Sequence, residues 1–124
     1  MTHIEQFKNH KYMNLETFRK NGEGVKTPVW FAQDGNTLRI WTESRTGKVK
    51  RIRRDGTVRV TPSTASGEPL GEWTEAKAIV LEEPEEVKRT KDLFYQKYGW
   101  MFNMFAFLGK MRGGNFITLK VQFN

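Results

Sequence analysis

The chain of 124 residues contains no cysteine, which excludes disulfide bonds and metal sites built on thiolates. It has only two histidines, His3 and His10, and both lie near the N-terminus. A Ser-His-Asp or Cys-His hydrolase is therefore disfavoured. Since no group of histidines and carboxylates has the spacing of a metal site, we expect no metal. No residue stands out as catalytic.

Long apolar runs are also missing. The most apolar stretch, from Tyr98 to Met111, is shorter than the ~20 residues that a membrane-spanning helix needs. The first residues lack the apolar core of a secretory signal. We therefore expect a cytoplasmic protein without a membrane partner.

Basic residues are in excess. The chain has 21 Lys and Arg against 14 Asp and Glu, and its net charge is +7. This balance favours an anionic partner, such as nucleic acid, acidic lipid or a phosphorylated small molecule.

The length predicts a single domain over residues 1–124. Because a domain of this size buries a modest fraction of its surface, a subunit partner would help to stabilise it.

Alternating apolar residues and tight-turn dipeptides predict a mainly β fold. We expect strands over residues 12–18, 25–31, 37–42, 58–61, 72–82 and 117–123. The pairs Asn21-Gly22 and Asp34-Gly35 are hairpin signals, so the first three strands should form an antiparallel meander. Pro28 indicates an edge strand or a bulge, and Pro62 should stop the fourth strand. Residues 72–82 are partly apolar on both sides, which predicts a central strand.

Three helices should pack outside this sheet. Residues 46–54 have a helical period that ends at Asp55-Gly56, residues 84–98 begin with a proline and acids, and residues 100–108 are very apolar. We expect the aromatic residues over 94–107 to pack in the core or an interface. The order of elements predicts an antiparallel barrel of about six strands with short helices outside it.

A dense cluster of cations follows the third predicted strand. Its members are Arg45, Lys48, Lys50, Arg51, Arg53, Arg54 and Arg59. Gly47 permits a close backbone turn, and the first amides of a helix point donors at an anion. Arg adds a planar fork of donors and Lys a mobile charge. The alternative is a solvated helix face, but the hydroxyls of Thr42, Ser44 and Thr46 favour a phosphate or carboxylate site.

Two further features admit more than one interpretation. The proline at position 28 leaves backbone groups of Lys26–Trp30 partly unpaired, and these could bond the polar edge of a heteroaromatic ring. An edge strand that limits aggregation is the alternative. The aromatic content, 13% of the chain, together with its basic charge also admits stacking of single-stranded nucleic acid. Packing explains most aromatic residues in small barrels, so nucleic acid is the less favoured partner.

Several segments together resemble the pyridoxamine 5'-phosphate oxidase-like split-barrel superfamily, and its flavin/deazaflavin, coenzyme F-420-dependent oxidoreductase branch most of all. These segments are TFRKNGEGVKTPVWF, DGNTLRIWT, SRTGKVKRIRRDGTVRVTP, PLGEWTEAKAIVL and KYGWMFNMFAFLGKMRG. They cover nearly the whole chain. Two positions depart from many relatives: Asp55-Gly56 replaces an Asn-Pro pair, and Ser63 replaces a cysteine.

The resemblance implies a split β-barrel and a homodimer with its cofactor at the subunit interface. It implies that Lys26–Val29 line the cofactor ring, that Trp41 and Thr42 lie near its middle, and that nearby cations hold its phosphate. With Gly47 added from the turn argument, the candidate cofactor-binding residues are Lys26, Thr27, Pro28, Val29, Trp41, Thr42, Gly47, Lys48, Lys50 and Arg51.

The implied function is hydride transfer between a bound coenzyme F-420 or FMN and a small organic substrate. The cofactor carries the reactive atom, which explains why no catalytic residue is visible. The extra cations Arg45, Arg53 and Arg54 suit the long acidic tail of coenzyme F-420, with FMN close behind. A non-catalytic carrier of flavin or tetrapyrrole is the main alternative, and a basic nucleic-acid-binding module is a weaker one.

Overall fold

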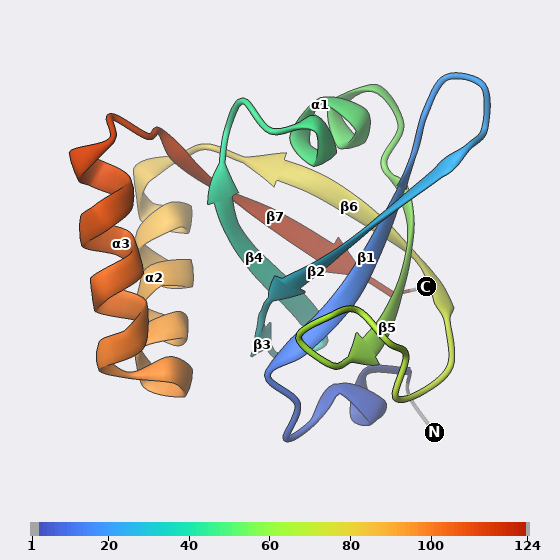
Figure 1. Cartoon of the computed structure of the whole chain (residues 1–124), viewed down its shortest axis with the longest axis horizontal. Helices are drawn as coiled ribbons and strands as arrows, with labels where there is room; N and C mark the ends of the chain where they lie inside the picture. The colour runs from blue at the N-terminus through green and yellow to red at the C-terminus, as the bar shows by residue number, and fades with distance from the viewer. Residues whose placement is uncertain (1–2, 124) are drawn as a thin grey trace.

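Seven antiparallel strands form one curled sheet in the computed structural model, which describes residues 3–123 (Figure 1). They are β1 (Tyr12–Phe18), β2 (Gly24–Trp30), β3 (Ala32–Asp34), β4 (Thr37–Glu43), β5 (Thr57–Ser63), β6 (Thr74–Leu81) and β7 (Phe116–Gln122). Their order in the sheet is β2-β1-β5-β6-β7-β4-β3. The sheet curls into a half-barrel, which confirms the predicted split-barrel fold. The seventh strand is the short β3, which the sequence did not indicate.

The predicted meander of the first three strands is wrong. The Asn21-Gly22 and Asp34-Gly35 turns do join the pairs β1–β2 and β3–β4. However, β2 and β4 lie in different parts of the sheet, because β4 pairs with β7 and sets Leu38 opposite Val121. Only Phe31 separates β2 from β3, although these strands are the two edges of the sheet. The edge position predicted from Pro28 is confirmed.

The helices lie on the outside of the half-barrel (Figure 1). They are a 3-10 turn (His3–Phe7), α1 (Gly47–Arg54), α2 (Pro84–Tyr98) and α3 (Trp100–Met111). Helix α2 contacts β3, β4 and β7, and α3 lies against α2 as the outermost layer of that side. None of the helices within residues 3–123 is long and apolar enough to cross a membrane.

The core lies inside the curl of the sheet. Alternate residues of the strands fill it, and Met13, Leu15 and Val60 are among those with no exposed area. Helix α1 closes one end with Val49 and Ile52, as its period predicted. A second cluster contains Phe94, Tyr98 and Phe102 and attaches α2 and α3 to the sheet.

One local expectation is wrong, and two others are confirmed in part. Strand β5 continues through Pro62. The proline is tolerated because the pairing of β5 with β6 already ends at Val60, so its missing N–H removes no hydrogen bond to β6. Strand β6 is a central strand, as predicted, but one of its faces is exposed at Lys77 and Ile79, as antiparallel sheets allow. Of the aromatic residues over 94–107, Phe94, Tyr98 and Phe102 are buried as predicted. Trp100, Phe105 and Phe107 are exposed in the single chain, because only one face of this outermost helix meets α2, and their packing in an interface stays a prediction.

Candidate functional site

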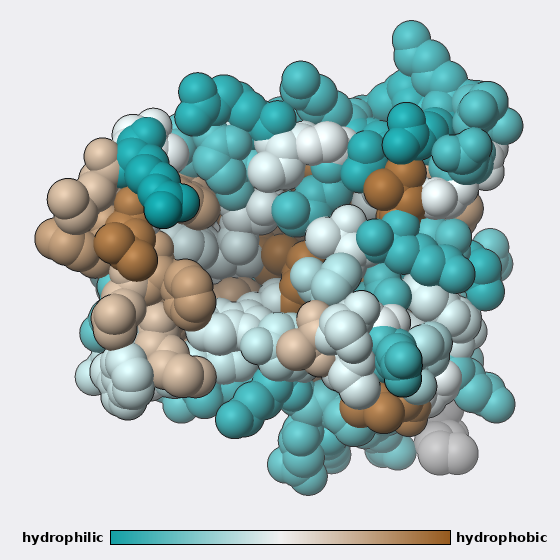
Figure 2. Space-filling view, in the orientation of Figure 1, coloured by the Kyte–Doolittle hydropathy of each residue, from teal (hydrophilic) through white to brown (hydrophobic). Residues whose placement is uncertain are grey.

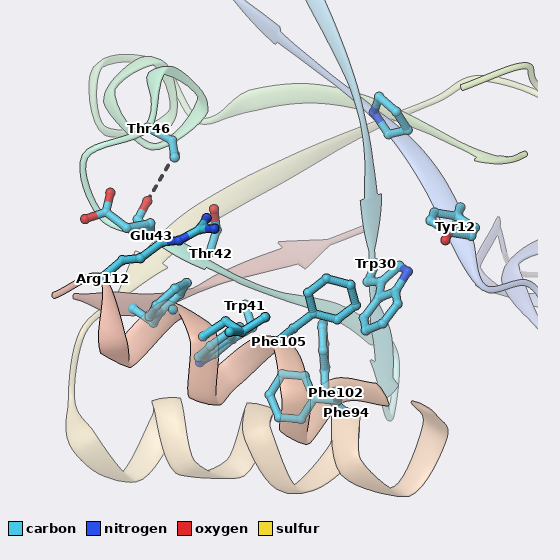
Figure 3. A pocket seen from close by; sticks show the side chains of 14 residues that line it. Tyr12, Trp30, Trp41, Thr42, Glu43, Thr46, Phe94, Phe102, Phe105 and Arg112 are labelled. Carbon is cyan, nitrogen blue, oxygen red and sulfur yellow. Dashed lines mark hydrogen bonds between the residues drawn. The ribbon is translucent and has the colours of Figure 1, made fainter. Parts of the chain in front are cut away.

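A pocket of about 540 Å³ lies between β2, β4 and α3, and it is the main candidate site (Figure 3). Figure 2 shows the surface hollowed in this region, between the helices and the rest of the sheet. We call it the aromatic pocket, since seven of its lining residues are aromatic: Tyr12, Trp30, Trp41, Phe94, Phe102, Phe105 and Phe116.

Stacking fixes the aromatic walls. The Trp30 ring lies parallel to the Tyr98 ring at a centroid distance of 4.2 Å, and the edge of Phe105 meets it at 5.1 Å. On the opposite wall, the Trp41 ring stacks on Phe116 at 3.9 Å. Stacked and edge-to-face aromatic pairs stabilise each other beyond the apolar area that they bury. The pocket therefore presents flat apolar surfaces in fixed orientations.

Polar groups gather at one end of this pocket. Figure 3 shows Thr42, Glu43, Thr46 and Arg112 at that end and Trp30, Phe94 and Phe105 at the other. The Thr46 hydroxyl donates to the Glu43 carbonyl oxygen at 3.1 Å. The side-chain bond from Arg45, at 2.7 Å, lowers the pKa of Glu43, so this carboxylate is ionised at neutral pH. In the wall beside this end, the buried Nε1 of Trp41 has no hydrogen-bond partner among the described residues.

A second hollow of about 350 Å³ is lined by cations alone. These are Arg19, Lys20, Lys50, Arg51 and Arg54, and we call the site the basic hollow. Arg19 and Lys20 directly follow β1, in the turn to β2, and the other three come from α1. The Arg51 Nε donates to the Thr17 hydroxyl at 2.6 Å, which holds its guanidinium between helix and strand. Burial, followed by the charge of Arg19, lowers the pKa of Arg51, as expected for a cation held among other cations.

Helix α1 connects the two hollows. Thr46 lines the aromatic pocket and immediately precedes α1, and its carbonyl oxygen accepts from the amide of Lys50 in the basic hollow at 3.2 Å. Lys48, one residue after the helix start, is half-buried, and burial lowers its pKa. An elongated ligand with a flat end and an anionic end could therefore follow α1 from one hollow to the other.

Five of the ten candidate cofactor-binding residues line one of the two hollows. Pro28, Trp41 and Thr42 line the aromatic pocket. Lys50 and Arg51 line the basic hollow.

The other candidate residues line neither hollow. Gly47 and Lys48 form the first turn of α1, between the two hollows. Thr27 and Val29 are half-buried in β2, where they pair with β1. Lys26 lies over the Trp73 ring, with its Nζ 5.1 Å from the ring centroid.

Comparison with known proteins supports a fold assignment. No family model matches the sequence, and no curated protein does. Solved structures do match: HutZ, the heme storage protein from Vibrio cholerae, has a TM-score of 0.72 at 12% identity, with 97% of this chain and 86% of HutZ covered.

Two further structures extend this likeness. A protein from Listeria innocua, described as a candidate pyridoxamine 5'-phosphate oxidase, has a TM-score of 0.66 at 14% identity. The match covers 95% of this chain and 87% of the Listeria protein. A structure named F420 reductase has a TM-score of 0.58 at 18% identity, and the match covers 96% of this chain and 90% of the reductase. The chain has the pyridoxamine 5'-phosphate oxidase-like split-barrel fold. At these identities the likeness concerns the fold of the split barrel, whereas its function has to be argued from the two hollows.

Sequence reasoning missed several lining residues of this split barrel. Arg19 and Lys20 were overlooked, although two adjacent cations beside the Asn21-Gly22 turn are a usable signal. Phe105 and Arg112 were also missed, because nothing in the sequence places α3 against β2 and β4. Conversely, Arg53 is paired with Glu82 at 3.0 Å and does not line the basic hollow.

Proposed function

We propose that this split barrel binds a flavin-type cofactor, coenzyme F-420 or FMN, and transfers hydride between it and a small organic substrate. One observation carries the proposal: the aromatic pocket and the basic hollow are joined by α1. That arrangement suits a flat ring system with a phosphate tail. The similarity to the structure named F420 reductase and to the Listeria innocua protein supports the same function.

The residues of the aromatic pocket fit a flavin-type ring. Its volume of about 540 Å³ is within the usual range for small-molecule sites, ~300–1,000 Å³. Trp30 and Trp41 supply flat walls. The unpartnered Nε1 of Trp41 is a buried donor, and a buried donor without an acceptor is costly. A carbonyl oxygen at the edge of the ring would satisfy it.

The basic hollow fits the anionic part of the cofactor. Lys50, Arg51 and Arg54 would hold the phosphate, because charge-assisted bonds from Arg and Lys are the strong ones. Arg19 and Lys20 extend the same positive surface beyond α1. A longer acidic tail would use these two cations, so we favour coenzyme F-420 over FMN.

When bound, the cofactor supplies the hydride chemistry, while the chain binds it, orients it and excludes water. Phe105 and Leu108 on α3 would shield the ring from solvent. Thr42 and Thr46 would orient its polar edge through their hydroxyl groups.

We also propose that the functional unit is a homodimer whose second subunit completes the pocket. Strand β2 is an edge of the sheet and carries the exposed residues Lys26 and Pro28 beside the aromatic pocket. An uncovered edge strand is an available pairing surface. Light scattering at increasing protein concentration tests this proposal, and a strictly monomeric protein that binds cofactor would contradict it.

Titration of the purified protein with coenzyme F-420 and with FMN, followed by absorbance and fluorescence, tests the function. Arg51→Ala should weaken binding by about 10- to 100-fold, since a hydrogen bond to a charged group contributes ~1.5–3 kcal/mol. Arg53→Ala is the matched control, because Arg53 is on the same helix but pairs with Glu82 outside the hollow. Failure of both cofactors to bind, or an equal loss in the two variants, would contradict the proposal.

A carrier of tetrapyrrole is the second candidate function. The similarity to HutZ supports it, and so does Tyr12 in the wall of the aromatic pocket, because tyrosine oxygen is a known ligand of haem iron. Titration with haemin should then give a Soret band that Tyr12→Phe shifts or removes. Failure to bind haemin would contradict this candidate, and an unchanged spectrum after the substitution would exclude Tyr12 as the iron ligand.

A further inference from the structure

Helix α3 carries an apolar stripe on the side that faces away from the protein. The stripe consists of Trp100, Met104, Phe107 and Met111, and we call it the outer stripe. These residues are 69%, 55%, 64% and 70% exposed. Their spacing places them on one face of a helix with 3.6 residues per turn, nearly opposite the buried Phe102.

An apolar face on the outside of a surface helix is unusual. Surface helices normally turn polar residues to water, whereas a helix that is apolar on both faces is covered on both. Within residues 3–123, the stripe has no cover, since α3 is the outermost layer (Figure 1). Figure 2 shows the tan and brown patch that results on the side of the molecule where α3 lies. Contiguous patches of this kind mark contact surfaces.

The charges around the stripe indicate what covers it. Lys110 is exposed and lies beside the stripe at the C-terminal end of α3. The sequence from Gly99 to Gly114 contains no acidic residue, and the whole chain has a net charge of +7. A second copy that docked through the same helix would bring its own Lys110 against this patch. A surface with anionic lipids would instead be attracted to it.

We propose that α3 docks this protein on the surface of a bilayer that contains anionic lipid. The helix lies parallel to the surface, with the outer stripe among the headgroups and upper acyl chains and Lys110 at the phosphates. Aromatic and aliphatic residues flanked by Lys and Arg are the composition of such interfacial helices. The expectation of no membrane partner rested on the lack of a long apolar run, which concerns spanning alone. This proposal does not depend on the cofactor.

Flotation of the full chain with vesicles tests the proposal. We expect it to bind vesicles of phosphatidylcholine mixed with phosphatidylglycerol, more weakly those of phosphatidylcholine alone, and less at high salt. The double variant Phe107→Asn/Met111→Asn should bind at least about tenfold more weakly, since each side chain loses apolar contact with lipid. Lys110→Gln should lose part of the dependence on anionic lipid.

Matched controls separate the stripe from other surfaces. Leu70→Asn removes an apolar side chain that is 55% exposed in the β5–β6 loop, and Lys8→Gln removes an exposed cation near the N-terminus. Both should bind vesicles as the unchanged protein does, and circular dichroism should show every variant folded. Absence of vesicle binding, or equal binding by the stripe variant, would overturn the proposal. It would also be overturned if the stripe variant converted a dimer into a monomer, because a second copy would then cover α3.

Discussion

The carboxylate of Asp34 should be a main electrostatic contributor to the stability of this split barrel. Its Oδ2 accepts from the Nε of Arg39 at 2.9 Å and from the Nε of Arg89 at 2.8 Å. The Arg39 side chain is only 3% exposed and also donates to Glu86 at 2.7 Å. Asp34 therefore links the β3–β4 hairpin to α2, the helix that supports the aromatic pocket.

The change we consider is Asp34→Asn, which keeps the shape and removes the charge. The hydrogen bond from Arg89, together with the charges of both arginines, lowers the pKa of Asp34 from 3.8 to about 2. That difference corresponds to about 2.5 kcal/mol, at ~1.36 kcal/mol per pH unit. Arg89 is 58% exposed, so solvent screens part of its contribution. We expect a loss of about 2 kcal/mol at pH 7.

The loss of stability in Asp34→Asn should depend on pH, because folding lowers the pKa of Asp34. A carboxylate whose pKa is lowered on folding stabilises the protein above its unfolded pKa, and the stabilisation disappears as the pH falls through the folded pKa. The difference between unchanged protein and variant should thus be complete above about pH 5 and fall to about half at pH 3. Urea unfolding followed by circular dichroism at both pH values measures it.

The control is Asp92→Asn, whose carboxylate pairs with Lys88 where the side chains are 60% and 77% exposed. Exposed pairs contribute little, so this change should cost below about 0.5 kcal/mol. A loss of that size for Asp34→Asn, or a loss that stays constant down to pH 3, would refute the reasoning.

Three further predictions concern the support of the pocket. Tyr98→Phe should lower stability by about 1–3 kcal/mol in thermal unfolding, because it leaves the buried Phe31 amide unpaired; an unchanged melting temperature would contradict this. Phe94→Ala should cost about 3–5 kcal/mol in urea, since Phe94 is 1% exposed beneath the pocket, and a loss below about 1 kcal/mol would show that the site collapses freely. Burial lowers the pKa of Lys97 to about 8, so amine acylation at pH 8, followed by mass spectrometry, should label Lys97 faster than Lys88; slower labelling would contradict it.

The sequence predicted local features well. The hairpin dipeptides, the helical period of α1 and the sequence alternation over β1 and β7 all depend on neighbours along the chain, and the two turns, the helix and the two strands lie at the expected places. The edge position of β2 followed from Pro28 for the same reason, because a missing N–H is a local property. The split-barrel fold followed from the combined motifs of nearly the whole chain.

Long-range packing could not be predicted in the same way. The pairing of β4 with β7 joins segments that lie far apart in the sequence, and the hairpin signal between β2 and β4 pointed to the wrong neighbour. The position of α3 depends on that pairing, so Phe105 and Arg112 could not be assigned to a site. Packing also decides which cations are available to a ligand. Arg53 forms an ion pair with Glu82, whereas Arg51 donates to the Thr17 hydroxyl and lines the basic hollow.

The passage from β2 to β3 has a consequence for the width of the aromatic pocket. Phe31 alone links the two edges of the sheet, and Tyr98 and Lys97 bind its amide and carbonyl oxygen at 3.0 and 2.8 Å. The distance between the walls that carry Trp30 and Trp41 is thus limited by one residue of covalent chain. An insertion at this point would act as a spacer, widening the site for larger ligands while the barrel core keeps its packing. The length of the link at Phe31 therefore limits the size of any ligand that the pocket could accept.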